Sequence, residues 1–324
     1  MNQDFMRILA ALVTALIAAL AATPLVRAMA IRIGAIDVPK DARRMHKKPI
    51  PLIGGLAIFF GFSLSAGIFY SIFFGLDRQA ITVWFGGLFI VALGVIDDMI
   101  ALNPWVKLAG QFVGAGIAVS QHFVIDYVNI GGFEVDFGIA AYPITVLWIV
   151  IMTNAVNLID GLDGLACGVS VISSVSLLII AMLRSDTQTA LLTAALCGAC
   201  LGFLPYNANP AKIFMGDTGS FVLGGAVAAL AIVTKTELFL PILGAVYVAE
   251  VLSDIIQVSV YKKTKKRVFR MAPLHHHFEL GGWKEQKVVY TFWTAAVIAV
   301  VVGLILYMLT DVGAMLMLRG VWNG

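Results

Sequence analysis

The sequence predicts an all-α polytopic membrane protein from its composition, its long apolar runs and its charge distribution. Of the 324 residues, 60% are hydrophobic and 13% are charged, with a mean hydropathy of +0.94. A soluble domain carries about twice that share of charged residues. In lipid, only helices and closed barrels satisfy every backbone polar group, and the apolar runs approach the ~20 residues that one helix needs. We therefore expect one integral membrane domain over residues 1–324, without an internal repeat or a soluble domain.

The apolar runs predict ten transmembrane helices in a regular series. Their approximate ranges are 6–30, 52–74, 80–96, 104–121, 140–157, 164–183, 188–205, 217–234, 238–261 and 287–310. The first run follows Arg7 as a signal peptide would, but it continues past twenty apolar residues and has basic residues at its far end, so we expect a retained span. Residues 124–137 alternate apolar and polar around Gly131-Gly132, which predicts a small outer β-hairpin.

The distribution of Lys and Arg predicts the orientation. One set of alternate loops carries most of the basic residues, with clusters at 40–48 and 262–270. The opposite loops and the C-terminal tail carry only Arg78, Arg184, Lys235 and Arg319. By the positive-inside rule the basic loops are cytoplasmic, and both termini are outside.

A polar stripe interrupts the apolar sequence between the fifth and sixth predicted spans. Asn154, Asn157, Asp160 and Asp163 recur every three residues, and i, i+3 positions are neighbours on a helix. Gly161 and Gly164 would allow the helix to end among the carboxylates. Because ionisable groups near hydrocarbon are costly, the stripe predicts a functional site, with a hydrated loop as the structural alternative.

Three further aspartates, in two places in the sequence, are expected on the same cytoplasmic side. Asp97 and Asp98 end the third span, and Lys107 opens the fourth. Adjacent carboxylates repel each other unless a cation, a proton or water relieves them, although a solvated helix end is an alternative. Asp217 precedes the eighth span, where capping and the helix dipole alone favour a carboxylate.

The loop before Asp217 adds different chemistry. Asn207 offers an amide, Lys212 a cation and Phe214 an aromatic ring within one short segment. Such a combination of groups beside a carboxylate favours a binding site.

The last cytoplasmic loop contains three consecutive histidines, His275, His276 and His277. Zinc ligands must converge, and no cysteine cluster accompanies these side chains, so we expect phosphate contacts rather than zinc. Glu250 and Asp254 lie four residues apart in the ninth span and either line a groove or form interhelical hydrogen bonds. The first basic loop, which includes Lys48, either contacts phosphate or only fixes the topology.

Together these groups indicate a divalent cation and a polyanion at the water–lipid boundary. Magnesium takes oxygen ligands, commonly one or two protein carboxylates with phosphate oxygens and waters. The position of the site suggests one lipid reactant and one cytosolic reactant. We therefore expect phosphoryl transfer onto a lipid, in which positioning and charge neutralisation supply most of the catalysis. An ion-coupled transporter is a remote alternative, because transporter sites lie near the midplane of repeated folds.

The motifs Asp97-Asp98, NAVNLIDGLDGLACG, LPYNANPAKIFMGDTGS and HHHFE, in this order, resemble the polyprenyl-phosphate N-acetylhexosamine-1-phosphate transferase superfamily. The resemblance covers almost the whole chain. It implies ten membrane helices, a bacterial plasma membrane location with a cytoplasmic site, and magnesium as the cofactor. It also implies transfer of a sugar-1-phosphate from a UDP-sugar to undecaprenyl phosphate with release of UMP. Membrane lipid is a further partner, nucleic acid is not, and a homodimer is compatible with the resemblance.

The resemblance also assigns roles to residues. Asn157 and Asp217 resemble magnesium ligands, and Asp97 or Asp98 resembles a proposed base. His276 resembles a catalytic histidine near the diphosphate. The remaining matches resemble substrate-binding residues for uridine or phosphate: Lys48, Lys107, Asp160, Asp163, Asn207, Phe214 and His275. We favour single displacement over a covalent aspartyl-phosphate, because a lipid monophosphate (second pKa about 6) is largely dianionic near neutral pH and needs little base assistance.

Two branches of the superfamily differ in the donor sugar. Three features resemble the UDP-N-acetylglucosamine branch, which initiates teichoic acids, O-antigens and related envelope polysaccharides: RRMHKKPIPLIGG, the short link from Asp97-Asp98 to Lys107, and LPYNANPAKIFMGDTGS. The segment MAPLHHHFELGGW instead resembles phospho-N-acetylmuramoyl-pentapeptide transferase, which makes lipid I of peptidoglycan. Because more segments match the first branch, we expect N-acetylglucosamine-1-phosphate transfer, with the second branch as the alternative.

Overall fold

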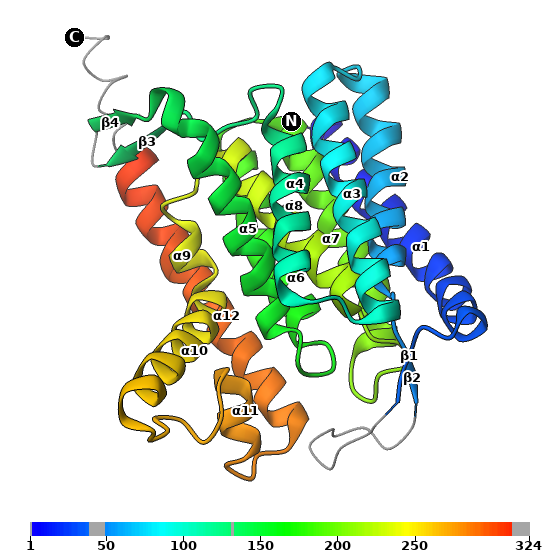
Figure 1. Cartoon of the computed structure of the whole chain (residues 1–324). Coiled ribbons are helices and arrows are strands. Elements are labelled where there is room, and N and C mark those ends of the chain that lie inside the picture. The colour runs from blue at the N-terminus through cyan, green and yellow to red at the C-terminus, as the bar shows by residue number, and fades with distance from the viewer. Residues whose placement is uncertain (1, 39–48, 131–132, 313–324) are drawn as a thin grey trace.

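A computed structural model describes residues 2–38, 49–130 and 133–312, which form a bundle of long helices (Figure 1). The elements before the polar stripe are α1 (Asn2–Ile33), β1 (Ile36–Asp37), β2 (Ile50–Pro51), α2 (Gly55–Phe73), α3 (Arg78–Ile100), α4 (Pro104–Val119), β3 (Tyr127–Ile130), β4 (Phe133–Asp136) and the 3₁₀ turn Gly138–Ala140. Those that follow are α5 (Ala141–Ile159), α6 (Leu165–Leu183), α7 (Thr187–Asn207), α8 (Gly216–Thr234), α9 (Leu240–Leu243), α10 (Ala245–Thr264), α11 (Leu274–Glu279), α12 (Glu285–Tyr307) and the π-helical turn Met308–Val312.

The helices confirm the all-α polytopic class. Within the described residues, 8 helices are long and apolar enough to cross a membrane. Each corresponds to one of the predicted spans. The predicted fourth and ninth spans, 104–121 and 238–261, do not meet the same criterion. α4 has only 16 residues, and the ninth segment breaks at Gly244 into α9 and α10.

The bundle has an interior formed mainly by α6, α7 and α8, whose faces are largely buried. α1 packs on α7 and α2, α5 packs on α8, and α3 lies against α4 and α8. By contrast, α1, α3 and α12 expose large apolar side chains on their outer faces. Such faces are compatible with hydrocarbon, because lipid tails are as apolar as the side chains that they contact.

Both small sheets are antiparallel hairpins. β3 pairs with β4 from Tyr127↔Asp136 to Ile130↔Phe133, so the predicted hairpin is present. β1 pairs with β2 through Ile36↔Pro51 and Asp37↔Ile50. Lys48 belongs to the segment 39–48 and lies outside the described residues.

The two ends of the bundle carry different elements. The start of α1, the end of α12 and the β3–β4 hairpin lie at one end, whereas β1–β2 and α11 lie at the other (Figure 1). The prediction that both termini lie outside stays a prediction. α10, which begins directly after the break at Gly244, diverges from the other helices (Figure 1). We refer below to the end with β1–β2 and α11 as the site end, and to the other as the hairpin end.

Candidate active site

A network of carboxylates around one lysine forms the centre of the site end. Lys107, at the start of α4, forms ion pairs with Asp97 of α3 and with Asp217 of α8, the latter at 2.8 Å. The other oxygen of Asp217 accepts a hydrogen bond from the Asn157 amide of α5 at 2.7 Å. Four helices therefore converge on Asp217, and the structure brings these four predicted residues together.

Asp98 has a different environment from its neighbour Asp97. Its carboxylate accepts hydrogen bonds from the backbone N–H of Asp217 (2.8 Å), the backbone N–H of Thr218 (3.0 Å) and the Thr218 hydroxyl (2.6 Å). These backbone donors are among those that a helix N-terminus leaves without intrahelical partners. Asp98 thus caps α8 from another helix and fixes the position of Asp217. In this structure Asp97, rather than Asp98, faces Lys107.

The segment before α2 explains how the start of α8 reaches this place. Phe214 N–H donates to Pro51 O at 2.8 Å, and Gly54 N–H donates to Phe214 O at 3.0 Å. A Cβ on Gly55 would overlap the backbone of Gly219. The glycines of the PIPLIGG segment therefore permit backbone contact between two helix starts, a role that its lack of side-chain chemistry concealed in the sequence.

The polar stripe divides into helical and turn positions. α5 ends at Ile159, so Asp160 and Asp163 lie in the α5–α6 turn and not on a continuous helical face. Asn157 also donates to Ser220 Oγ at 3.0 Å. Asn154 donates instead to Gln111 Oε1 of α4 at 2.5 Å, which makes it an interhelical contact.

The side chain of Asp160 differs from the other carboxylates of the site. Within the described part of the chain, no hydrogen bond or ion pair engages its side chain. Burial, followed by the charges of Asp217, Asp98 and Asp163, raises the pKa of Asp160 well above its usual value. A group with these properties is suited to contact a ligand that supplies donors or positive charge.

The predicted uridine-binding residues lie at the end of α7, on the α7–α8 loop and in the α5–α6 turn. Asn207 is 3% exposed, donates to Ile213 O at 3.3 Å, and leaves its buried Oδ1 without a hydrogen bond. Phe214 is half-buried, with its backbone fixed by Pro51 and Gly54. The Asp163 carboxylate accepts the Ala211 N–H at 2.9 Å, so it joins the turn to the loop.

The three histidines have three different partners. His275 is buried and contacts Glu250 of α10 through its backbone N–H (3.2 Å) and its Nδ1 (3.3 Å). His276 Nδ1 lies 2.7 Å from Glu279 Oε2, and His277 Nδ1 accepts the backbone N–H of Arg270. The three rings therefore do not share one partner.

His275 joins the histidine helix to the acidic turn. A Cβ on Gly161 would overlap the His275 ring, whose buried Nε2 has no hydrogen bond in the structure. Glu250 was expected to form interhelical hydrogen bonds or to line a groove, and its contacts with His275 are hydrogen bonds between α10 and α11. α11 consequently lies against the turn that carries Asp160 and Asp163.

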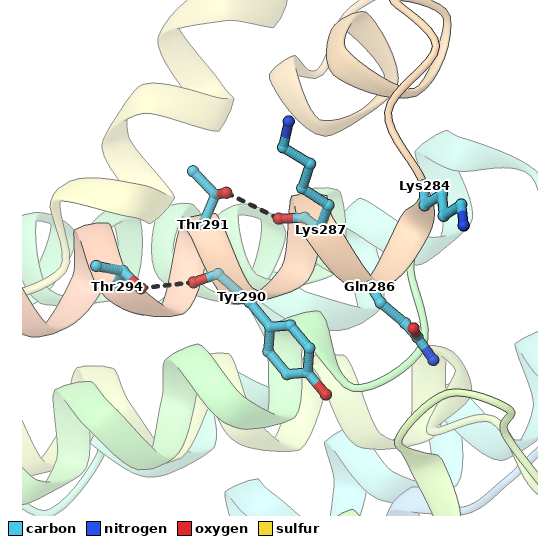
Figure 2. A pocket seen from close by; sticks show the side chains of 6 residues that line it. All are labelled: Lys284, Gln286, Lys287, Tyr290, Thr291 and Thr294. Carbon is cyan, nitrogen blue, oxygen red and sulfur yellow. Dashed lines mark hydrogen bonds between the residues drawn. The ribbon is translucent and has the colours of Figure 1, made fainter.

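Two hollows border α12. One, of about 450 Å³, lies between α7 and α12 and includes Asp163, Asn209 and Trp293 in its lining. The other is an open hollow of about 410 Å³ along α12 itself. Of its lining residues, Lys287 and Thr291 point to one side of the helix, and Gln286 and Tyr290 point to the other (Figure 2). Neither hollow contains Asp97, Lys107 or Asp217.

The donor set fits magnesium bound together with a substrate. Among the described residues, no three His, Cys, Asp or Glu side chains are grouped closely enough to hold a metal ion. Magnesium commonly takes only one or two protein carboxylates and completes its coordination with phosphate oxygens and water. The carboxylates of Asp97, Asp160 and Asp217 outnumber the single Lys107 cation among them, which favours additional positive charge.

Comparison with known proteins identifies the family. The model of glycosyl transferase family 4 matches residues 80–235. A phospho-N-acetylmuramoyl-pentapeptide-transferase of Heliobacterium modesticaldum is 45% identical over 286 residues, which cover 83% of this chain and 87% of the relative. Proteins of the same name from Bacillus pumilus and Bacillus subtilis are 41% and 40% identical, with the same coverage.

The chain belongs to glycosyl transferase family 4. It is therefore a phospho-sugar transferase and a multi-pass protein of the bacterial plasma membrane. The predicted superfamily, enzyme class and location are confirmed at this level.

The prediction of the N-acetylglucosamine branch is wrong. Relatives at 40% to 45% identity over most of the chain carry the name of the other branch. The error came from counting segments. Within the described residues, PIPLIGG and LPYNANPAKIFMGDTGS meet at the start of α8, away from the histidine helix. The single segment MAPLHHHFELGGW resembles the branch whose name these relatives carry.

Proposed function

We propose that this protein transfers phospho-N-acetylmuramoyl-pentapeptide from its UDP-linked donor to undecaprenyl phosphate, forming lipid I and releasing UMP. The observation that carries the proposal is the 45% identity, over 83% of the chain, to a relative named for this reaction. The polar network at the site end supports it, because carboxylates and one lysine converge where α3, α4, α5 and α8 meet.

In the proposed reaction, a phosphate oxygen of the lipid attacks the sugar-linked phosphorus of the donor. One P–O bond forms, the diphosphate P–O bond breaks, and UMP leaves with the electron pair. Because the lipid phosphate is already largely dianionic near neutral pH, with a second pKa of about 6, proton removal is not the main requirement. What the reaction requires is alignment of two anions and relief of their repulsion.

The residues divide this work by position. Lys107 supplies positive charge to the phosphates, and Asp98 keeps the start of α8 in place so that Asp217 stays beside Lys107. Asp217 and Asn157 would hold magnesium, which when bound would neutralise charge on the diphosphate. Asp160, Asp163, Asn207 and Phe214 would bind the uridine, with the Phe214 ring available for stacking on uracil.

Separate assays with two donors test the proposed reaction. Purified protein in detergent receives undecaprenyl phosphate, magnesium and either UDP-N-acetylmuramoyl-pentapeptide or UDP-N-acetylglucosamine, and UMP release is measured. We expect release with the first donor only. Release with UDP-N-acetylglucosamine alone, or with neither donor, would refute the proposal.

A further inference from the structure

Asn209 lies between two carboxylates that come from distant parts of the chain. Its amide Nδ2 donates to Asp163 Oδ2 at 3.1 Å and to Glu285 Oε2 at 2.8 Å. Glu285, the first residue of α12, also accepts the backbone N–H of Asp163 at 2.8 Å. The Asn209 carbonyl oxygen accepts from Gln286 at 3.0 Å. We call Asp163, Asn209, Glu285 and Gln286 the amide bridge.

The bridge is a costly arrangement without its central amide. Two carboxylates brought to the same nitrogen repel each other, and hydrogen bonds to charged groups are stronger than those between neutral groups. The Asn209 amide nitrogen donates a hydrogen bond to each of the two carboxylates, and Gln286 donates one to the Asn209 carbonyl oxygen. Capping of α12 by Glu285 would explain a carboxylate at the helix start, but it would not explain why Glu285 contacts Asp163 and Asn209.

The bridge fixes the loop that leads to the active site. Asp163 accepts the Ala211 N–H at 2.9 Å, and Arg27 of α1 donates to Lys212 O at 3.0 Å. Phe214 follows within two residues, and its backbone is bound to Pro51 and Gly54. The bridge therefore holds one side of the α7–α8 loop, and the segment before α2 holds the other.

We propose that Asn209 and Glu285 are positioning residues for the nucleotide: they hold Asp163 and the α7–α8 loop in the arrangement that receives the uridine phosphate. Neither residue touches the reacting phosphates in this proposal, which rests on the proposed function. The bridge also joins the α12 start, and through it the histidine loop, to the nucleotide loop. The α7–α8 loop, which would contact the donor's nucleotide, is thus linked by hydrogen bonds to the start of α12, which follows the histidine loop that would contact the diphosphate.

Nucleotide affinity is the property that the bridge should control. For Glu285→Ala and Asn209→Leu, we expect the dissociation constant of UMP and the KM of the UDP-linked donor to rise about tenfold, the cost of losing hydrogen bonds to a charged group. The KM of undecaprenyl phosphate and the kcat at saturating donor should stay within about threefold, because the reacting groups remain. Glu285→Gln keeps one acceptor for the Asp163 N–H and should show a smaller rise.

Asn209→Asp adds a readout that a purely structural role would not change. The introduced carboxyl would stand beside Asp163 and Glu285, whose charges raise its pKa. When protonated it can donate one hydrogen bond, so UMP affinity should recover as the pH falls. The Asn209→Leu variant has no such group and should show no recovery relative to wild type.

The matched control is Thr291→Val. Thr291 is exposed on the opposite side of α12 from Gln286 (Figure 2), and its hydroxyl donates to the Lys287 carbonyl of its own helix. It should leave UMP binding unchanged. If Glu285→Ala does not fold, as judged by its melting temperature, Glu285→Gln and Asn209→Leu provide the test.

UMP affinity within twofold of wild type in the folded Glu285 and Asn209 variants would overturn the proposal. UMP binding does not depend on the donor sugar. Wild type that binds UMP but uses neither donor would therefore refute the proposed function and leave the bridge testable by binding. Wild type that does not bind UMP would overturn both.

Discussion

The site end and the hairpin end both contain a lysine beside acidic residues, but they use it differently. At the hairpin end, Lys235 pairs with one exposed carboxylate, Asp126, and lies 4.8 Å from the Tyr127 ring centroid. At the site end, Lys107 is shared between Asp97, whose side chain is 1% exposed, and Asp217. Asp160 adds a carboxylate that no described residue engages.

The pKa values of Asp126 and Asp160 shift in opposite directions. Burial alone would raise the pKa of Asp126, but the hydrogen bond and charge of Lys235 hold it below its usual value. The pKa of Asp160 is raised by burial and by three carboxylates. Lys235 therefore balances the charge of Asp126 within the protein, whereas the charged groups that act on Asp160 are all carboxylates. This difference indicates that the site end is built to receive a cationic or metal-bound partner.

The strongest challenge to this comparison is Asp217→Asn, which removes charge from the centre of the site end. We expect UMP release to fall at least about 10²–10³-fold, the usual effect of removing one electrostatic contact in an active site. The melting temperature should stay close to that of wild type, because the asparagine oxygen can still accept from Asn157. Full turnover by this variant would show that Asp217 is not a magnesium ligand.

Lys107→Ala should have the next largest effect, on both activity and stability. The substitution leaves Asp97 and Asp217 facing each other without a cation, and we expect a loss of about 2 kcal/mol, below the 3–5 kcal/mol of a fully buried pair because Lys107 is partly exposed. UMP release should fall about 100-fold. Melting curves and initial rates measure the two effects. An active, equally stable variant would show that Lys107 is not needed to balance the charges of Asp97 and Asp217.

Glu237→Gln tests the hairpin end through pH. Burial raises the pKa of Glu237 to about 7, with Lys235, Asp126 and Arg184 as the nearby charges. Because the folded-state pKa lies above the unfolded value, the wild type loses stability as pH rises from about 4.5 through 7. The variant lacks this loss and should be about 3 kcal/mol more stable than wild type at pH 8 and equal to it below pH 4.5. Equal melting temperatures across this range would exclude the buried carboxyl as a pH-dependent cost.

Lys235→Ala should have the smallest effect and is the matched control for Lys107→Ala. An exposed ion pair contributes about 0.2–1 kcal/mol, and its Tyr127 contact adds little at an exposed site. We expect a small decrease in melting temperature and unchanged UMP release. Loss of activity comparable to that of Lys107→Ala would mean that the two ends do not differ in role.

The long helices could be predicted from the sequence because their signal is local. The run 217–234 became Gly216–Thr234, and the run 164–183 became Leu165–Leu183. Hydropathy over ~20 residues defines such elements whatever they pack against. The break at Gly244 was missed because the residues on both sides are apolar, and the chain can turn there without changing composition.

The candidate site could be predicted only in part. Motif spacing singled out Asp97, Asn157 and Asp217, which the structure brings together around Lys107. It could not distinguish Asp98 as the cap of α8, because that contact joins residues about 120 positions apart. Asn209 and Glu285 were missed for the same reason: Asn209 stands in LPYNANPAKIFMGDTGS and Glu285 in none of the motifs, and their contact joins residues 76 positions apart.

Manganese binding gives the most direct test of the unbalanced charge at the site end. Mn²⁺ can stand in for magnesium, and electron paramagnetic resonance measures its free and bound fractions in the presence of UMP. We expect wild type and Lys235→Ala to bind one ion with equal affinity, and Asp217→Asn to lose at least about tenfold in affinity. Equal binding by Asp217→Asn and wild type would contradict the account.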